Sequence, residues 1–226
     1  MCKFKSSITM KDQIFIPDYD SHSQMLDELG IEDTEKNAET KFIRAELYPK
    51  DGDVFSSVDE WVYKVDQDIL PGWYVASYDE QRVREAVKKW VDKHVHIGKK
   101  NFSVNGGTHY FKNCENVTLR DNSTATLYGN STATLYGNST ATLCDNSTAT
   151  LWDNSTATLR DNSTATLYGN STATLRDNST AIAPVYSSVP KENIILSDNS
   201  TFKDRRTKTI YQSGDWKLEI VEGKKE

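Results

Sequence analysis

Few side chains in this sequence have the types and spacing that catalysis or metal binding requires. His94 and His96 would place two imidazoles on one face of a strand, but no Cys or carboxylate completes a tetrahedral metal set beside them. Cys144 has no neighbouring histidine that would activate a thiolate. Asp66 and Asp68 are two positions apart and would point to different sides of a helix, so they form no acid/base dyad. We therefore predict a protein without enzymatic activity, metal or cofactor.

Composition and motifs exclude several further classes. Phosphate-binding loops and the HExxH, GxSxG and CxxC motifs are absent from the sequence. The 226 residues include 27 basic and 33 acidic side chains, and this net charge of -6 disfavours a protein that neutralises nucleic-acid phosphates. No apolar run approaches the roughly 18 residues of a membrane helix, and the N-terminus lacks the apolar core of a secretory signal. Three cysteines without CxxC spacing indicate free thiols, so we expect a cytoplasmic protein that binds neither nucleic acid nor membrane.

The strongest pattern is an eight-residue repeat in the second half of the chain. From Asn122 the sequence reads NSTATLYG, NSTATLYG, NSTATLCD, NSTATLWD, NSTATLRD, NSTATLYG, NSTATLRD and NSTAIAPV. Weaker copies precede it, CENVTLRD from Cys114 and GGTHYFKN from Gly106. A fixed period of this kind is the signature of a repeat architecture. The NST tripeptides match a glycosylation acceptor only as a by-product of the repeat.

Each repeat predicts a short strand followed by a corner. The alternation places Ser123, Ala125 and Leu127 on one face and Thr124 and Thr126 on the other. The Tyr-Gly, Arg-Asp or Trp-Asp pair and the following Asn have the composition of a turn. Two octads then form one 16-residue coil, and the coils stack at the roughly 4.8 Å spacing of β-strands. We predict a mainly β protein with an octapeptide-repeat β-solenoid, two octads per coil, and ladders of stacked Asn side chains at its corners.

Two alternatives to an intramolecular solenoid remain at this point. The enrichment in Ser, Thr, Asn and Gly is also found in disordered low-complexity segments, although the regular Leu and the frequent aromatic residues argue against disorder. A trimeric fibre, in which three chains share one β-structured shaft, would show a similar alternation. Periodicity alone does not separate stacking within a chain from stacking between chains.

The predicted solenoid displays two kinds of regular surface. Outward threonines would form flat arrays, beginning with Thr124, Thr126, Thr132, Thr134, Thr140 and Thr142. The seventh residue of each octad would form two corner columns, one of Tyr136, Trp152 and Tyr168 and the other of Tyr128, Cys144, Arg160 and Arg176. Exposed Tyr, Trp and Arg side chains are typical interface anchors, whereas stacked aromatics can also simply stiffen a corner. We select these aromatic and arginine residues as candidate interaction residues.

The repeat resembles a known family. The frame Tyr-Gly-Asn-Ser-Thr-Ala-Thr is similar to the Tyr-Gly-Ser-Thr-x-Thr frame of bacterial ice-nucleation proteins. This resemblance implies a 16-residue β-solenoid, threonine arrays that order water, and tyrosine ladders that serve dimerisation. It covers only about residues 114–183, and this chain differs by an extra Asn in each corner and by a short array of four or five coils. Because fold does not determine function, the resemblance predicts the solenoid better than the activity.

The flanking segments also resemble uncharacterised proteins from gut bacteria and their phages. In those proteins a leader like IPDYDSHSQMLDELGIEDTEKNAETKF and a VDQDILPGWY segment precede asparagine-serine octads. This resemblance assigns no activity. It favours a phage or prophage gene product located in the cytoplasm of a bacterial host.

The flanks are expected to cover the open ends of the solenoid. We predict a polar acidic leader, partly disordered, over 1–40, an α+β capping domain over 41–105, repeats over 106–185, and a C-terminal linker with a β-hairpin cap over 186–226. The expected elements are a short helix at 23–29, a strand at 42–48, a helix near 58–68 capped by Ser57, a helix near 79–94, and a hairpin of 207–212 with 215–221.

Three functions fit these features. The leading hypothesis is a binding or scaffold protein that self-associates into a homo-oligomer, or binds a protein partner, through the aromatic column or the threonine faces. The second is an ice- or water-ordering surface built on the Thr-x-Thr arrays. The third is a virion fibre or tail subunit, which would form a trimer that resists denaturant.

Overall fold

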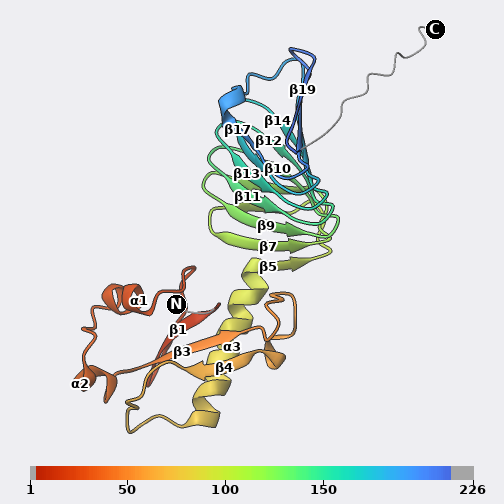
Figure 1. The fold of residues 1–226 in the computed structure, drawn as a ribbon. Coiled ribbons are helices and arrows are strands. Elements are labelled where there is room, and N and C mark those ends of the chain that lie inside the picture. The colour runs from red at the N-terminus through yellow and green to blue at the C-terminus, as the bar shows by residue number, and fades with distance from the viewer. Residues whose placement is uncertain (1–3, 215–226) are drawn as a thin grey trace, which may run out of the picture. The chain divides into compact units, whose positions relative to one another are not determined.

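The computed structural model describes residues 4–214 of the chain. The chain divides into two compact units, Met1–Ile97 and Gly98–Glu226, which are coloured red to yellow and green to blue in Figure 1. The protein is mainly β, with 37% strand and 17% helix, and the second unit contains a β-solenoid of about six turns. The predicted fold class is confirmed.

The N-terminal unit is built on a four-stranded antiparallel sheet in the order β2-β1-β3-β4. Its strands are β1 (Ser6–Met10), β2 (Ile14–Phe15), β3 (Phe42–Tyr48) and β4 (Val62–Val65). β1 pairs with β3 along its whole length, from Ser6 opposite Glu46 to Met10 opposite Phe42. The strand predicted at 42–48 is confirmed. Because Ser6 to Thr9 are all buried, both faces of the sheet are covered at β1.

Three α-helices pack on this sheet. They are α1 (His22–Glu28), α2 (Glu35–Ala38) and α3 (Ala76–His94). Ser21 begins α1 by accepting a hydrogen bond from the Gln24 backbone N–H, as serine commonly does at a helix start. α3 contacts β1, β2 and β3, and its buried positions include Val83, Val87 and Trp90. The helices predicted at 23–29 and 79–94 are confirmed.

The helix predicted near 58–68 is wrong. Ser57 does accept a backbone hydrogen bond from Asp59, but the helical segment is a single 3-10 turn, η1 (Val58–Glu60). The chain then becomes β4, in which Val62 pairs with Tyr48. The apolar residues of this short stretch fit helical spacing. The segment Val-Tyr-Lys-Val is nevertheless rich in β-branched and aromatic residues, which favour a strand paired with β3 over a helix.

The leader also differs from the prediction of a partly disordered 1–40 segment. Its described residues contain β1, β2, α1 and α2. Since β1 lies between β2 and β3, the leader and the segment from 41 to 97 share one sheet and one compact unit. That unit ends with β5 (Val95–Ile97), eight residues before the limit of 105 that the sequence predicted. Ser6, Ser7 and Thr9 are polar, which is why β1 shows no strand-like hydrophobic alternation.

The first sheet of the solenoid has eight strands in the order β19-β18-β16-β14-β12-β10-β8-β6. All neighbouring strands of this sheet from β6 to β18 run parallel, and β19 is antiparallel to β18. Thr132 pairs with Thr148, and Thr148 pairs with Thr164 in the next coil. This advance of 16 residues confirms two octads per coil. The strands are β6 (Ser103–Asn105), β8 (Val117–Arg120), β10 (Thr132–Leu135), β12 (Thr148–Leu151), β14 (Thr164–Leu167), β16 (Thr180–Ala183), β18 (Thr201–Asp204) and β19 (Thr209–Gln212).

The second sheet contains the intervening strands, in the order β17-β15-β13-β11-β9-β7 within this unit. Thr124 pairs with Thr140, and Thr140 pairs with Thr156, so the same 16-residue register holds. All this pairing occurs within one chain. The strands are β7 (Thr108–Lys112), β9 (Thr124–Tyr128), β11 (Thr140–Leu143), β13 (Thr156–Leu159), β15 (Thr172–Leu175) and β17 (Ile194–Leu196).

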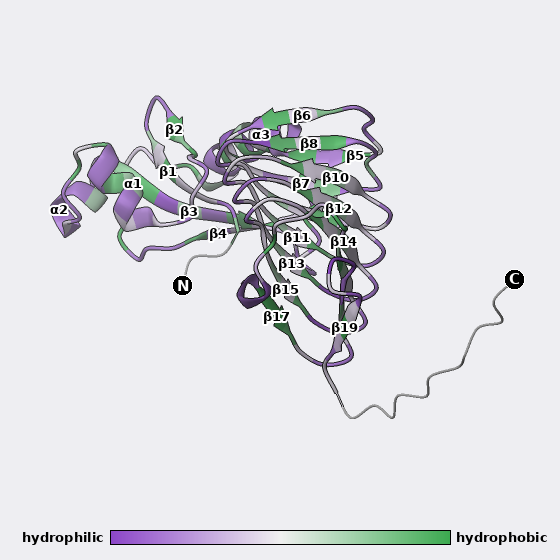
Figure 2. Ribbon diagram, turned by 90° about the horizontal axis from the view of Figure 1, so that it is seen from above, coloured by the Kyte–Doolittle hydropathy of each residue, from purple (hydrophilic) through white to green (hydrophobic). Residues whose placement is uncertain are grey.

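The core lies between the two sheets and is built from the inward residues of every octad. Ser123, Ala125 and Leu127 are buried, and the equivalent residues of the other octads are buried as well. Thr124 is exposed and Thr126 is half-buried on the opposite face. The predicted assignment of faces is therefore confirmed. In Figure 2 the hydrophobic colouring follows the strands, while the corners of the coils are largely hydrophilic.

The corners are stabilised by hydrogen bonds between successive coils. Asp145 and Asp161 have positive φ angles of 57° and 55°, which Asp tolerates better than most residues. The Asp161 carboxylate accepts a hydrogen bond from the Asp145 backbone N–H at 3.1 Å. The predicted Asn ladder occurs in part, because Asn170 donates to Asn154 at 3.3 Å and Asn193 donates to Asn170 at 3.3 Å.

The last coil ends in an antiparallel pair. β18 runs parallel to β16, and β19 turns back to pair with β18, from Thr201 opposite Gln212 to Asp204 opposite Thr209. Of the strand predicted at 207–212, residues 209–212 therefore pair with β18. The second strand of the predicted hairpin, 215–221, lies outside the described residues.

An ion pair fixes the turn between β18 and β19, and it predicts an acid sensitivity. Asp204 is buried and accepts hydrogen bonds from Arg206 Nε and Nη2, each at 2.9 Å. These bonds lower the pKa of Asp204 to about 2. Because this pKa is lowered, the ionised Asp204 stabilises the fold above the ordinary aspartate pKa, and this stabilisation is lost as the pH falls towards 2.

Between pH 5 and 2, the free energy of unfolding of the native chain, measured in urea, should fall by about 1–2 kcal/mol more than that of an Asp204→Asn variant. Equal losses in the two proteins would contradict this role.

No α-helix between residues 4 and 214 combines the length and the apolar composition needed to cross a membrane.

Candidate interaction surface

The solenoid places the two predicted corner columns in register. Trp152 donates its backbone N–H to Leu135 at 3.0 Å, and Tyr168 donates to Leu151 at 2.9 Å. Tyr136 is held to Leu119 in the same way at 2.9 Å. Each side chain therefore leaves the chain just after a strand of the eight-stranded sheet, one above the next. The backbone hydrogen bonds between successive coils are therefore sufficient to align the aromatic column.

Within this column the aromatic contacts are unequal. The Trp152 and Tyr168 rings are stacked, with centroids 4.1 Å apart and planes inclined by 5°. The Trp152 side chain nevertheless remains 37% exposed. Arg120 places its guanidinium 5.2 Å from the centroid of the Tyr136 ring, a cation-π geometry. Arg120 is not among the predicted interaction residues, although the octad from Cys114 places it 16 residues before Tyr136.

The second column is more polar. Cys144, Arg160 and Arg176 donate their backbone N–H groups to the preceding coil at 2.9 to 3.0 Å, which aligns them after strands of the other sheet. Tyr128 and Cys144 are half-buried, whereas Arg160 and Arg176 are exposed. Burial raises the pKa of the Cys144 thiol, so the reactive thiolate is disfavoured. The arginines are thus the accessible groups of this column.

The threonine arrays cover both outer faces, but the two faces differ. Thr124, Thr126, Thr140 and Thr142 lie on one sheet, and Thr132 and Thr134 lie on the other. On the eight-stranded sheet a groove of about 260 Å³ runs between two threonine columns. Ala133 and Ala149 contribute to its lining and are 6% and 5% exposed, against 1% for Ala125 and Ala141 on the opposite sheet.

The two histidines of the sequence motif are not neighbours on one strand. His94 is the last residue of α3, and His96 lies in β5. Both are buried, and the His94 ring stacks on Trp90 with centroids 4.5 Å apart while its Nε2 lies 3.2 Å from the Asp18 carboxylate. In the part of the chain that the structure describes, no three His, Cys, Asp or Glu side chains gather as a potential metal site.

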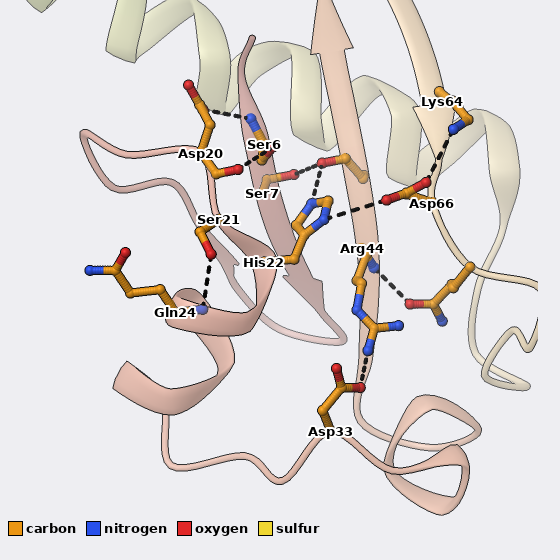
Figure 3. A network of polar contacts seen from close by, with 12 residues as sticks. Ser6, Ser7, Asp20, Ser21, His22, Gln24, Asp33, Arg44, Lys64 and Asp66 are labelled. Atoms are coloured by element: carbon orange, nitrogen blue, oxygen red, sulfur yellow. Dashed lines mark hydrogen bonds and ion pairs between the residues drawn. The ribbon is translucent and has the colours of Figure 1, made fainter. Parts of the chain in front are cut away.

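The N-terminal unit contains a polar network that includes a Ser, a His and an Asp (Figure 3). Ser7 Oγ donates to the Ala45 carbonyl at 3.3 Å, and His22 Nε2 lies 3.3 Å from the same oxygen. His22 Nδ1 lies 3.7 Å from Asp66, which is also hydrogen-bonded to Lys64. Burial lowers the pKa of His22. Because Ser7 is fully buried and directed at a backbone carbonyl, this network joins α1 to the sheet and has no accessible nucleophile.

No protein-family model, curated protein or solved structure matches this chain. The assignment of a β-solenoid thus rests on the 16-residue register between paired strands in the structure. The similarity of the repeat to ice-nucleation proteins remains a resemblance of short sequence motifs.

Proposed function

We propose that this protein is a non-enzymatic binding scaffold that self-associates, or binds a protein partner, through a corner surface. This surface consists of the aromatic column Tyr136, Trp152 and Tyr168 together with Arg120, which lies over the Tyr136 ring. The observation that carries the proposal is the stacked pair of Trp152 and Tyr168 on a partly exposed corner. Large aromatic side chains that are already ordered lose little conformational entropy on binding and are enriched at interface hot spots. The solenoid supplies the rigid support.

The arginines extend this surface chemically. Arg120 lies at one end of the aromatic column, and Arg160 and Arg176 are exposed in the second column. Arginine combines stacking on aromatic rings with bidentate hydrogen bonds to carboxylates. A partner surface with apolar and acidic groups, including a second copy of this acidic chain, would complement these columns.

Replacing Trp152 and Tyr168 together by serine should weaken self-association at least about tenfold, because truncation of an interface hot spot costs about 2 kcal/mol or more. The association constant is measured by sedimentation equilibrium over a range of protein concentrations. Tyr186→Ser is the matched control, since Tyr186 is 95% exposed but lies outside the aromatic column. An unchanged association constant, together with an unchanged set of proteins retained by the tagged chain in affinity capture from a bacterial lysate, would refute the role of the column.

The threonine arrays support a second candidate function, the ordering of water or ice. Their columns repeat with the strand spacing, about 4.8 Å, and the groove on the eight-stranded sheet runs between two of them. Hydroxyl and methyl groups at fixed intervals could hold water in a regular arrangement. The absence of large apolar side chains from these columns favours hydrated contacts.

This second function makes its own prediction. Thr150 lies in the groove on β12, so Thr150→Lys should abolish any slowing of ice recrystallisation by the native chain at micromolar concentration. Thr158→Lys, on the opposite sheet, is the matched control and should retain the effect. Ice growth that is the same with native protein, Thr150→Lys and buffer would exclude this function.

A further inference from the structure

The edge of the N-terminal sheet at β2 is open. β2 is the end strand of this sheet, and no other strand of the described chain pairs with its outer side. Met10 donates its backbone N–H to the Gln13 carbonyl at 2.8 Å, and Ile8 pairs with Phe15. Residues of an antiparallel strand alternate between bonding to one neighbour and facing the other side. The backbone N–H and C=O of Ile14 therefore point outward, and no residue between 4 and 214 bonds to them.

Helix α3 runs beside this open edge and is tied to the chain at both ends of β2. Arg82 Nη2 donates to the Met10 carbonyl at 3.0 Å, at the turn that precedes β2. Trp90 Nε1 donates to the Asp18 carboxylate at 3.2 Å, in the segment that follows β2. The helix and the strand therefore lie alongside each other from one contact to the other.

A cavity of about 560 Å³ lies between the helix and the strand, a volume typical of ligand-binding sites. Its β2 side includes Ile14 and Ile16, and its α3 side includes Ala86, which is half-buried. The small Ala86 side chain leaves room for another chain in the middle of the helix wall. Open backbone groups beside apolar side chains form a site at which an extended strand can add.

The helix wall of the cavity also carries two exposed lysines. Lys89 and Lys93 line the cavity and lie one turn apart on the same face of α3. Lys88, next to them in the sequence, is paired with Asp59 at 2.7 Å. Lys89 and Lys93 form no ion pair with a residue between 4 and 214. An occupant with negative charge would complement this part of the cavity.

Acidic side chains line the cavity as well, but protein groups already engage two of them. Asp18 Oδ1 accepts the indole N–H described above and lies 3.2 Å from His94 Nε2. Glu85 accepts a hydrogen bond from Gln81 at 2.9 Å. The third, Asp12, is exposed in the turn between β1 and β2. The charge left for an occupant to neutralise is therefore that of the two lysines.

We propose that this cavity binds an extended, acidic segment of a partner protein, which adds to the open edge of β2 as a fifth strand. The segment would exchange backbone hydrogen bonds with Ile14, pack on Ala86, and place its carboxylates at the two lysines. Main-chain pairing would supply affinity, and the lysines would supply the preference for acidic sequences. All of these residues belong to the N-terminal unit, so the inference is independent of the proposed role of the aromatic column.

A fluorescein-labelled octapeptide of alternating valine and glutamate tests this proposal, and the matched probe has lysine in place of each glutamate. Fluorescence anisotropy with the full-length chain should show that the glutamate peptide binds at least about tenfold more tightly, because Lys89 and Lys93 attract it and repel the other. Since the chain as a whole is acidic, non-specific attraction would favour the lysine peptide. Equal binding of the two peptides, or tighter binding of the lysine peptide, would overturn the proposal.

Two changes in the cavity should weaken binding of the glutamate peptide. Lys89→Glu/Lys93→Glu reverses the charge and should raise the dissociation constant at least about tenfold. Lys36→Glu/Lys41→Glu, the same change at exposed lysines outside the cavity, is the matched control and should leave it unchanged. Ala86→Gln occupies the middle of the cavity without changing its charge and should also weaken binding. Cavity variants that bind as tightly as the control would show that the peptide binds elsewhere, and the proposal would be wrong.

Amide exchange distinguishes strand addition from attraction by charge alone. A saturating concentration of the glutamate peptide should slow exchange of the Ile14 amide at least about tenfold, because this N–H gains an acceptor. The Ala157 amide on β13, in the solenoid, should be unaffected. Trp152→Ser/Tyr168→Ser should show the same slowing at Ile14, so the result does not depend on whether the aromatic column binds a partner. Unchanged exchange of the Ile14 amide in the peptide complex would refute the added strand.

Discussion

Replacing Leu151 by alanine should lower the free energy of unfolding of the solenoid by about 2–5 kcal/mol, the usual cost of removing a buried leucine side chain and leaving a cavity. Leu151 is fully buried on β12, and it is aligned between Leu135 and Leu167 of the adjacent coils. Because each coil contacts chiefly its neighbours, the cavity weakens two interfaces of the stack at once.

The measurement must separate the solenoid from the N-terminal unit. Hydrogen exchange of amides in β10, β12 and β14 reports on the solenoid, while amides in α3 serve as an internal reference. Thr150→Ala is the matched control, because it also shortens a β12 side chain, but one that points outward. It should cost less than about 1 kcal/mol. A similar loss of protection in both variants would mean that the leucine column does not form an enclosed core.

The solenoid could be predicted because the same eight-residue pattern of inward, outward and turn residues recurs along the sequence. A spacing of eight between asparagines, with inward Ser, Ala and Leu, allows a single register, and pairing of Thr132 with Thr148 follows from it. A slip by one residue would place every leucine outside. The same register predicted the corner columns, but not that Trp152 stacks on Tyr168 while Arg120 lies over Tyr136. Such contacts depend on side-chain torsions, which the repeat does not specify.

The N-terminal unit was harder to predict because its elements are each formed once and depend on tertiary contacts. The apolar spacing around Trp61 suggested a helix, but pairing of Val62 with Tyr48 made this segment a strand. β1 consists largely of buried Ser and Thr beside a buried Lys5, which is an unusual composition for a central strand. Its stability comes from polar partners distant in sequence, such as Asp20, and no local pattern identifies them.

Lys5 and Asp20 form the contact in this unit whose loss should be most damaging. Lys5 is 1% exposed, and its Nζ lies 2.9 Å from Asp20 Oδ1. The same ammonium group donates to the Tyr19 carbonyl at 3.3 Å and lies 4.8 Å from the centroid of a Trp90 ring. Asp20 Oδ1 also accepts the Ser6 backbone N–H at 3.0 Å, which ties the loop before α1 to β1 (Figure 3).

Asp20→Ala should therefore destabilise the N-terminal unit by about 2–3 kcal/mol, because it leaves a buried ammonium group without its counter-charge. The cost is below that of a fully buried pair, since the Asp20 side chain is 33% exposed and water can partly replace it. Hydrogen exchange of the α3 amides in urea measures the effect, with amides of β12 in the solenoid as internal reference. Asp12→Ala, which removes an exposed carboxylate in the same segment, is the control.

Two further variants separate charge from hydrogen bonding at this contact. Asp20→Asn retains an acceptor for the Ser6 N–H but not the negative charge, so it should recover only part of the loss. Lys5→Met in the Asp20→Ala background removes the isolated charge and fills the same volume with an apolar side chain. That double variant should be more stable than Asp20→Ala alone, as replacement of buried ion pairs by apolar residues commonly is. If the double variant is instead less stable by the sum of two independent losses, the ammonium group of Lys5 is stabilised chiefly by Tyr19 and Trp90, and not by Asp20.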